Sequence, residues 1–80
     1  AVHRPEKGES VREWLIASTT DQRQMATISV GYTQEKRAEA LTEAERLLAE
    51  ADSAGVPARL IATPNATDDV VITVDYLRQQ

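Results

Sequence analysis

The residues best suited to bind a small anion lie where a predicted strand meets a predicted helix. Tyr32 ends a strand-like segment, and Thr33 directly precedes a long helical pattern. The first N–H groups of a helix are unpaired and attract phosphate or carboxylate groups. Arg37, about one turn later, can add charged donors to the same anion. The junction at residues 31–37 therefore indicates a ligand-binding site at Tyr32, Thr33 and Arg37, although these residues also fit an ordinary capped helix start.

No other part of the sequence converges on a catalytic centre. The only histidine, His3, lies in a polar N-terminal stretch, and the chain contains no cysteine. Three glycines are too few for a glycine-rich phosphate loop. The paired carboxylates Asp68 and Asp69 lie in a turn-forming segment, where solvated carboxylates are common. The sequence therefore predicts a domain that is not an enzyme and has no metal site and no cofactor.

The chain length and the net charge limit which other functions the protein can have. The 80 residues are enough for one small domain, and the net charge of -4 argues against binding to a nucleic-acid backbone. The longest apolar run, at residues 14–17, is too short to cross a membrane. We therefore expect no nucleic-acid partner and no membrane insertion by this segment. Residues 1–10 are predicted to form a flexible lead-in, and residues 11–80 a single domain.

The clearest predicted element is a helix over residues 34–54. Its apolar residues recur at helical spacing, which predicts a buried stripe made of Ala40, Leu41, Ala44, Leu47, Leu48 and Ala51. The opposite face is expected to be solvated and holds Glu39, Glu43, Arg46 and Glu50. Thr33 can serve as the N-cap, and Gly55 can adopt the left-handed conformation that ends a helix.

Three segments have the apolar runs or the alternation of apolar and polar residues that predict β-strands, at residues 26–32, 58–63 and 69–76. The polar residues between the last two, at positions 64–69, are typical of a turn. The last two strands are therefore predicted to form a hairpin.

Residues 12–18 fit two structures. Ser10 followed by Glu13 resembles a helix capping box, which favours a helix. An internal comparison favours a strand, because LIAST at residues 15–19 resembles LIATP at residues 60–64, and ISVGY at residues 28–32 resembles ITVDY at residues 72–76. The predicted order is therefore β-β-α-β-β, as in a duplicated ββα unit.

These elements predict an α+β fold, in which a four-stranded, mainly antiparallel sheet carries one long helix on one face. Its topology would be related to the ferredoxin-like plan. The face turned away from the helix would be uncovered, with an interface predicted at Trp14, Thr27, Ser29, Val71 and Thr73. We therefore expect a noncatalytic protein-interaction, dimerisation or regulatory domain, part of a larger protein or oligomer. Its partner would be another protein or a second copy in a homodimer, and small-ligand or anion binding at residues 31–37 is the alternative.

Overall fold

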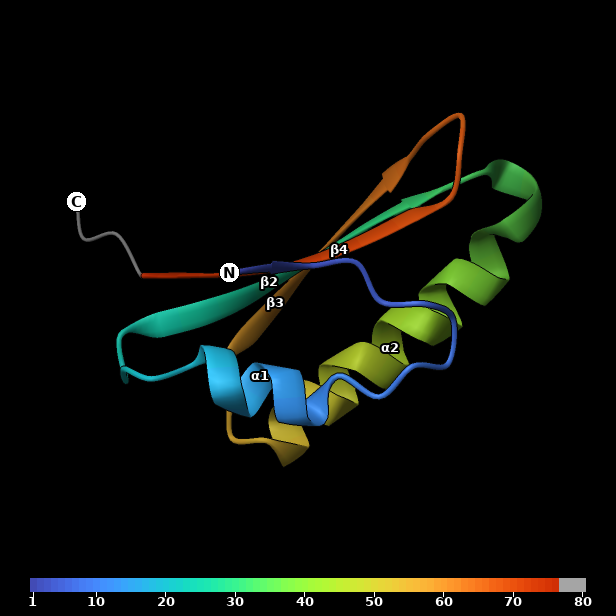
Figure 1. Cartoon of the computed structure of the whole chain (residues 1–80). Helices are drawn as coiled ribbons and strands as arrows, with labels where there is room; N and C mark the ends of the chain where they lie inside the picture. The colour runs from blue at the N-terminus through green and yellow to red at the C-terminus, as the bar shows by residue number, and fades with distance from the viewer. Residues whose placement is uncertain (77–80) are drawn as a thin grey trace.

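The computed structural model describes residues 1–76. Along this part of the chain the elements are β1 (Val2–His3), α1 (Arg12–Ser18), β2 (Gln24–Tyr32), a short 3-10 turn (Gln34–Lys36), α2 (Arg37–Ser53), β3 (Ala58–Pro64) and β4 (Asp69–Tyr76). Both helices lie on the same side of the sheet (Figure 1). The result is a two-layer α+β domain, as the sequence predicted. Within these residues no helix is long and apolar enough to span a membrane.

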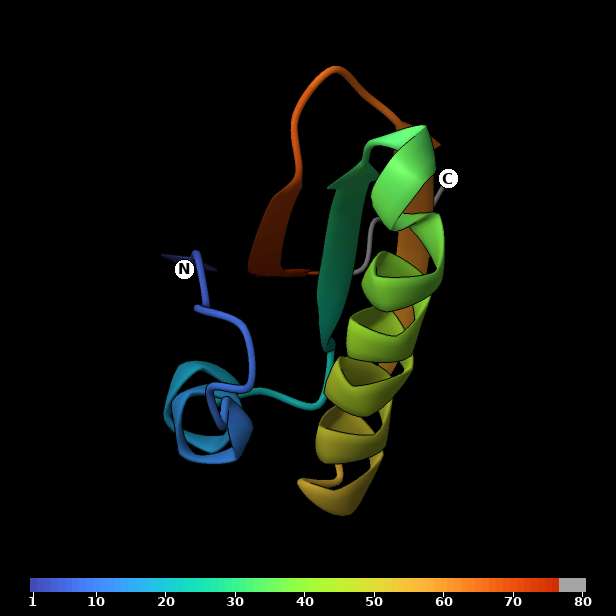
Figure 2. The ribbon, with the colours of Figure 1, turned by 90° about the vertical axis from the view of Figure 1, so that its right-hand side faces the viewer.

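The four strands form one mixed sheet in the order β1-β4-β2-β3. The central strand β2 runs parallel to β3 and antiparallel to β4. The prediction of a mainly antiparallel sheet is therefore wrong, because α2 connects β2 to β3 as a crossover and so makes them parallel neighbours. The ferredoxin-like order is not confirmed. Figure 2 shows α2 and β3 together on one side, with α1 and the N-terminus on the other.

The predicted hairpin between residues 58–63 and 69–76 is also wrong, because β2 lies between β3 and β4. The connection crosses the end of β2 instead of turning back beside β3. There the Asn65 N–H donates to the Tyr32 carbonyl at 2.8 Å. Gly31 gives the connection room, since a Cβ at this position would lie 3.1 Å from Asn65 Nδ2. Turn-forming residues suit this crossing as well as they suit a hairpin.

Residues 12–18 form helix α1, so the predicted strand and the duplicated ββα unit are wrong. Val11 and Leu15 are both completely buried, one helical turn apart. A strand would have directed alternate residues, such as Trp14 and Ile16, to one face of a sheet. The helix packs on α2. The similarity of LIAST to LIATP therefore reflects apolar composition alone.

The predicted long helix is confirmed, with a small difference in which residues it buries. The residues of α2 that are buried against the sheet are Ala44, Leu47 and Ala51, whereas Leu41 and Leu48 are only partly buried. Gly55 has a φ of 72°, the left-handed conformation predicted for the helix end. Thr33 precedes the 3-10 turn, but its side chain makes no capping hydrogen bond.

The core lies between the two helices and one face of the sheet. Val11 and Leu15 enter it from the side of α1, α2 contributes the buried residues named above, and the sheet contributes Ala26, Ile28, Val30, Ile72 and Val74. The first ten residues, predicted as a lead-in, also contact this domain. Their strand β1 pairs antiparallel with β4, through Val2 opposite Thr73 and His3 opposite Ile72.

Candidate functional site

The predicted anion site is divided by the fold. The Thr33 N–H, expected to bind an external anion, donates instead to Asp68 Oδ1 at 3.0 Å. The ammonium group of Lys36 lies 3.9 Å from the other oxygen of the same carboxylate. The start of the 3-10 turn is therefore already satisfied by an anion that the chain itself supplies.

Tyr32 and Arg37 do remain close together, on the other side of this turn. With Gln34, Pro64 and Asn65 they line a hollow of about 330 Å³ at the end of β3. Thr33 lines a separate hollow beside Asp68. The structure therefore brings together two of the three predicted ligand-binding residues, and Asp68 is the site residue that the sequence reasoning missed. Its position in a polar turn gave no signal that it would meet the Thr33 amide.

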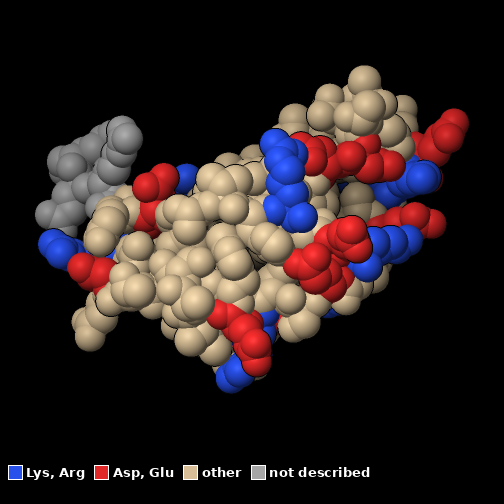
Figure 3. All heavy atoms as spheres, viewed as in Figure 1, with Lys and Arg blue, Asp and Glu red and all other residues tan. Residues whose placement is uncertain are grey.

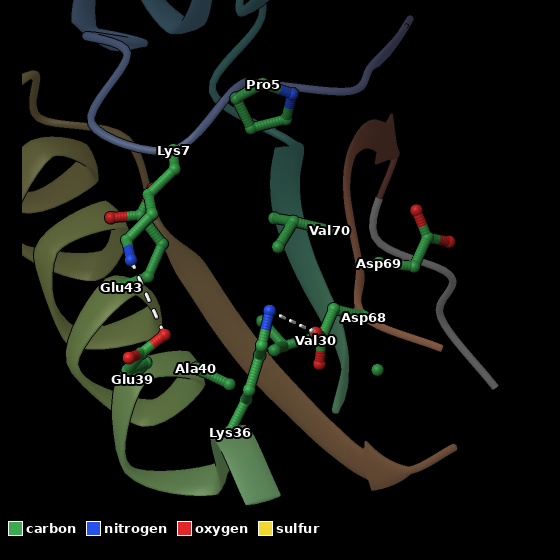
Figure 4. A pocket seen from close by; sticks show the side chains of 11 residues that line it. Pro5, Lys7, Val30, Lys36, Glu39, Ala40, Glu43, Asp68, Asp69 and Val70 are labelled. Carbon is green, nitrogen blue, oxygen red and sulfur yellow. Dashed lines mark hydrogen bonds and ion pairs between the residues drawn. The ribbon is translucent and has the colours of Figure 1, made fainter. Parts of the chain in front are cut away.

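A small pocket of about 180 Å³ lies between residues 5–7, the first half of α2 and the ends of β2 and β4 (Figure 4). Its apolar lining is Pro5, Val30, Ala40 and Val70. Charged side chains surround it, and Figure 4 shows Lys7 directed at Glu39 and Lys36 directed at Asp68. Figure 3 shows that both signs of charge gather at this end of the molecule. The pocket is thus small and bordered by charges that already pair with one another. Within residues 1–76 no three His, Asp or Glu side chains are arranged to hold a metal ion.

The acidic side of α2, predicted to be merely solvated, binds the N-terminal segment. Arg46 bridges Glu43 at 2.6 and 2.8 Å and Glu50 at 2.5 Å. The two carboxylates then accept hydrogen bonds from residues 8–11: Gly8 N–H to Glu43 at 3.0 Å, and Ser10 Oγ and Val11 N–H to Glu50 at 2.8 and 3.1 Å. The expectation of a solvated face is wrong at these positions, because helical periodicity cannot show which segment returns to cover a face.

Hydrogen bonds lower the pKa values of three carboxyl groups. Arg46 lowers the pKa of Glu43, His3 lowers that of Glu9, and Arg23 lowers that of Asp21. Each group therefore stays ionised in the folded protein at a pH at which its unfolded counterpart already takes up a proton. The stabilisation is complete above the ordinary pKa values of 4.5 for Glu and 3.8 for Asp and is lost as the pH falls through the lower folded values.

We therefore expect the thermal midpoint of unfolding to fall as the pH is lowered from 6 to about 3. Glu43→Gln should flatten this dependence, because it removes one of the carboxyl groups whose pKa is lowered. The matched variant Glu45→Gln should retain the full dependence. Calorimetry across the pH series would measure it, and equal slopes for the two variants would contradict the role given to Glu43.

The sheet face opposite the helices is open, and four of the five predicted interface residues lie on it. Thr27 is opposite Thr73, and Ser29 is opposite Val71, in the β2–β4 register. Arg59 of β3 donates to Thr27 Oγ1 at 3.0 Å. The fifth residue, Trp14, is elsewhere: it belongs to α1 and stacks on the ring of His3, with the centroids 5.1 Å apart. Its predicted place on the open face is wrong, because residues 12–18 are helical.

We call the sheet surface opposite the helices the open face. The sequence analysis did not predict all of its exposed apolar residues. Val2 and Ile61 are 66% and 46% exposed. Val2 lies in a strand that the sequence analysis did not predict, and Ile61 lies in a strand for which it predicted the wrong neighbour. Within residues 1–76, the chain forms an α+β domain whose sheet is covered by helices on one face only. Compared with family models, curated proteins and solved structures, the chain gives no match.

Proposed function

We propose that this chain is a noncatalytic protein-interaction domain that acts by associating with a second copy of itself. The observation that carries the proposal is the uncovered part of the sheet: within residues 1–76 both helices pack on one face, the opposite face has no helix, and the outer edge of β3 has no neighbouring strand. A second copy that covers part of this exposed sheet would bury its apolar side chains.

The composition of the uncovered surface supports this function. Exposed apolar side chains at Val2 and Ile61 lie among small polar residues such as Thr27, Ser29 and Thr73. Short side chains of this kind let another backbone or side chain approach closely, and they cost little entropy when they become ordered. The small size of the domain adds a reason, because a chain of 80 residues buries a modest fraction of its surface on folding alone.

The charged groups support a noncatalytic role. The carboxyl groups whose pKa values are lowered, at Glu9, Asp21 and Glu43, each pair with a neighbouring basic side chain. Catalytic acids and bases instead have pKa values tuned toward the working pH within a pocket. These three carboxyl groups therefore take part in structural ion pairs.

Self-association predicts a particle of about twice the 8.8 kDa chain mass. Size-exclusion chromatography coupled to light scattering should show it at tens of micromolar, and the thermal midpoint should rise with protein concentration by mass action. A particle of single-chain mass with a concentration-independent midpoint would reject the proposed function.

A further inference from the structure

Within residues 1–76, the outer edge of β3 carries backbone groups that have no strand beside them. In the part of the chain that the structure describes, β3 pairs on one side only, with β2. The hydrogen bonds at the two ends of this ladder join Ala26 N–H to the Pro57 carbonyl and Asn65 N–H to the Tyr32 carbonyl. In a parallel pair the backbone groups alternate in direction, so those facing the free edge belong to Ala58, Leu60 and Ala62. An unpaired edge of this length is a template for another strand.

One flank of α2 lies beside this edge and is partly apolar. The opposite flank is occupied, because Glu43 and Glu50 bind the N-terminal segment there. Arg37 lines the same hollow as Pro64, which places the start of α2 beside the end of β3. We call the following residues the edge flank: Arg37, Leu41, Leu48 and Asp52. Leu41 and Leu48 are only partly buried, and so is Leu60 on the neighbouring strand.

We propose that β3 pairs with β3 of a second copy, antiparallel about a twofold axis at Ile61, so that two sheets join into one. The inference rests on the proposed self-association and identifies its surface. In this register Ile61 lies opposite Ile61 of the second copy, which covers a side chain that is 46% exposed in the single chain. Arg59 then lies opposite Thr63, so the only charge on β3 does not meet its own copy.

The position of α2 fits this arrangement. The helix packs on both β2 and β3, so its axis lies about half a strand spacing inside β3. With strands about 4.8 Å apart, the two copies of α2 would be separated by about 10 Å, the usual distance between packed helices. The middle of α2 also lies over the middle of β3, because Arg37 is near Pro64 while the other end of α2 leads directly into Ala58.

The charges of the edge flank complement each other across the twofold axis. The spacing between Arg37 and Leu41 equals that between Leu48 and Asp52. When two copies of α2 pair antiparallel, Leu41 therefore lies beside Leu48 of the second copy, and Arg37 lies beside Asp52 of the second copy. Both charges oppose the helix dipole, since Arg37 begins α2 and Asp52 lies in its last turn. Among the described residues neither forms an ion pair. The second copy supplies the partner that each lacks.

A charge exchange tests this pairing. The single variants Arg37→Asp and Asp52→Arg each place like charges together at two symmetric points, and dimer affinity should fall roughly tenfold. The double variant should restore the affinity, because it recreates both pairs in reversed order. Each single change also suits the helix dipole, so the folded chain should be at least as stable as before. Light scattering over a dilution series measures the affinity, and circular dichroism confirms the fold.

Two further variants distinguish the edge from the open face. Leu41→Lys should abolish the dimer at tens of micromolar, whereas Val71→Lys, on the open face, should leave it intact. A double charge variant that binds no better than the single variants would overturn the edge pairing. Loss of the dimer in Val71→Lys but not in Leu41→Lys would also overturn it, while leaving the proposed function standing. A wild-type chain that stays single at all concentrations would reject both.

Discussion

Leu47→Ala should lower the free energy of unfolding by about 2–5 kcal/mol, the range found when a large buried aliphatic side chain is truncated. Leu47 is completely buried between α2 and the sheet. Its removal loses the apolar contacts and leaves a cavity that the surrounding strands can close only in part. So large a change is a considerable share of the stability of a small domain.

Ile16→Ala is the matched control, because it also truncates an aliphatic side chain within a helix. Ile16 is 46% exposed on α1, so its loss should cost well under half as much as the loss of Leu47. Urea unfolding of both variants should be followed at one fixed protein concentration, since self-association would add a concentration-dependent contribution. Similar unfolding midpoints would mean that α2 presents a different face to the sheet.

The sequence predicted α2 because its signals are local. The apolar stripe and Gly55 act within one or two helical turns, and both are found in the structure. The apolar stripe does not show which of its residues are buried most completely, however. Leu41, Leu47 and Leu48 are equivalent in the periodic pattern. The packing of the helix on the rest of the fold decides that Leu47 is fully buried, while Leu41 and Leu48 lie on the edge flank.

The arrangement of the strands could not be predicted from local patterns. An alternating strand has the same sequence whichever neighbour it pairs with, and residues 64–69 can turn back or cross over. The crossover through α2 brings β3 beside β2, and β4 pairs on the other side of β2 instead of at the free edge of β3. Residues 12–18 were assigned wrongly for a related reason: so short a segment becomes helical when its buried residues, Val11 and Leu15, find a helix to pack on.

In the candidate site, too, local features were predicted correctly and contacts between distant segments were not. Thr27, Ser29, Val71 and Thr73 were placed on one face correctly, because alternation alone fixes the face of a strand residue. The contact between Thr33 and Asp68 joins residues 35 positions apart in the sequence. No spacing rule predicts such a contact, so the predicted anion site could not be known to hold an internal carboxylate.

The role of Glu50 also depends on a distant segment, and it leads to the second large expected effect. Glu50→Ala should lower the free energy of unfolding by about 1–3 kcal/mol, the cost of leaving a buried polar group without its partner. Glu50 Oε1 accepts the N–H of Val11, a completely buried residue, at 3.1 Å. Without this acceptor the N–H must stay unpaired, or the start of α1 must move away from α2.

Two matched variants separate the hydrogen bond from the charge. Glu50→Gln keeps Oε1 as the acceptor for Ser10 and Val11, although its amide NH2 group cannot accept the hydrogen bond from Arg46, so it should cost less than Glu50→Ala. Glu45→Ala removes an exposed carboxylate from the same helix and should have almost no effect. Amide exchange gives a local readout: exchange at Val11 should quicken in Glu50→Ala and remain slow in Glu45→Ala. Unchanged exchange at Val11 in Glu50→Ala would show that α1 is held in place without this carboxylate, by the packing of Val11 and Leu15 alone.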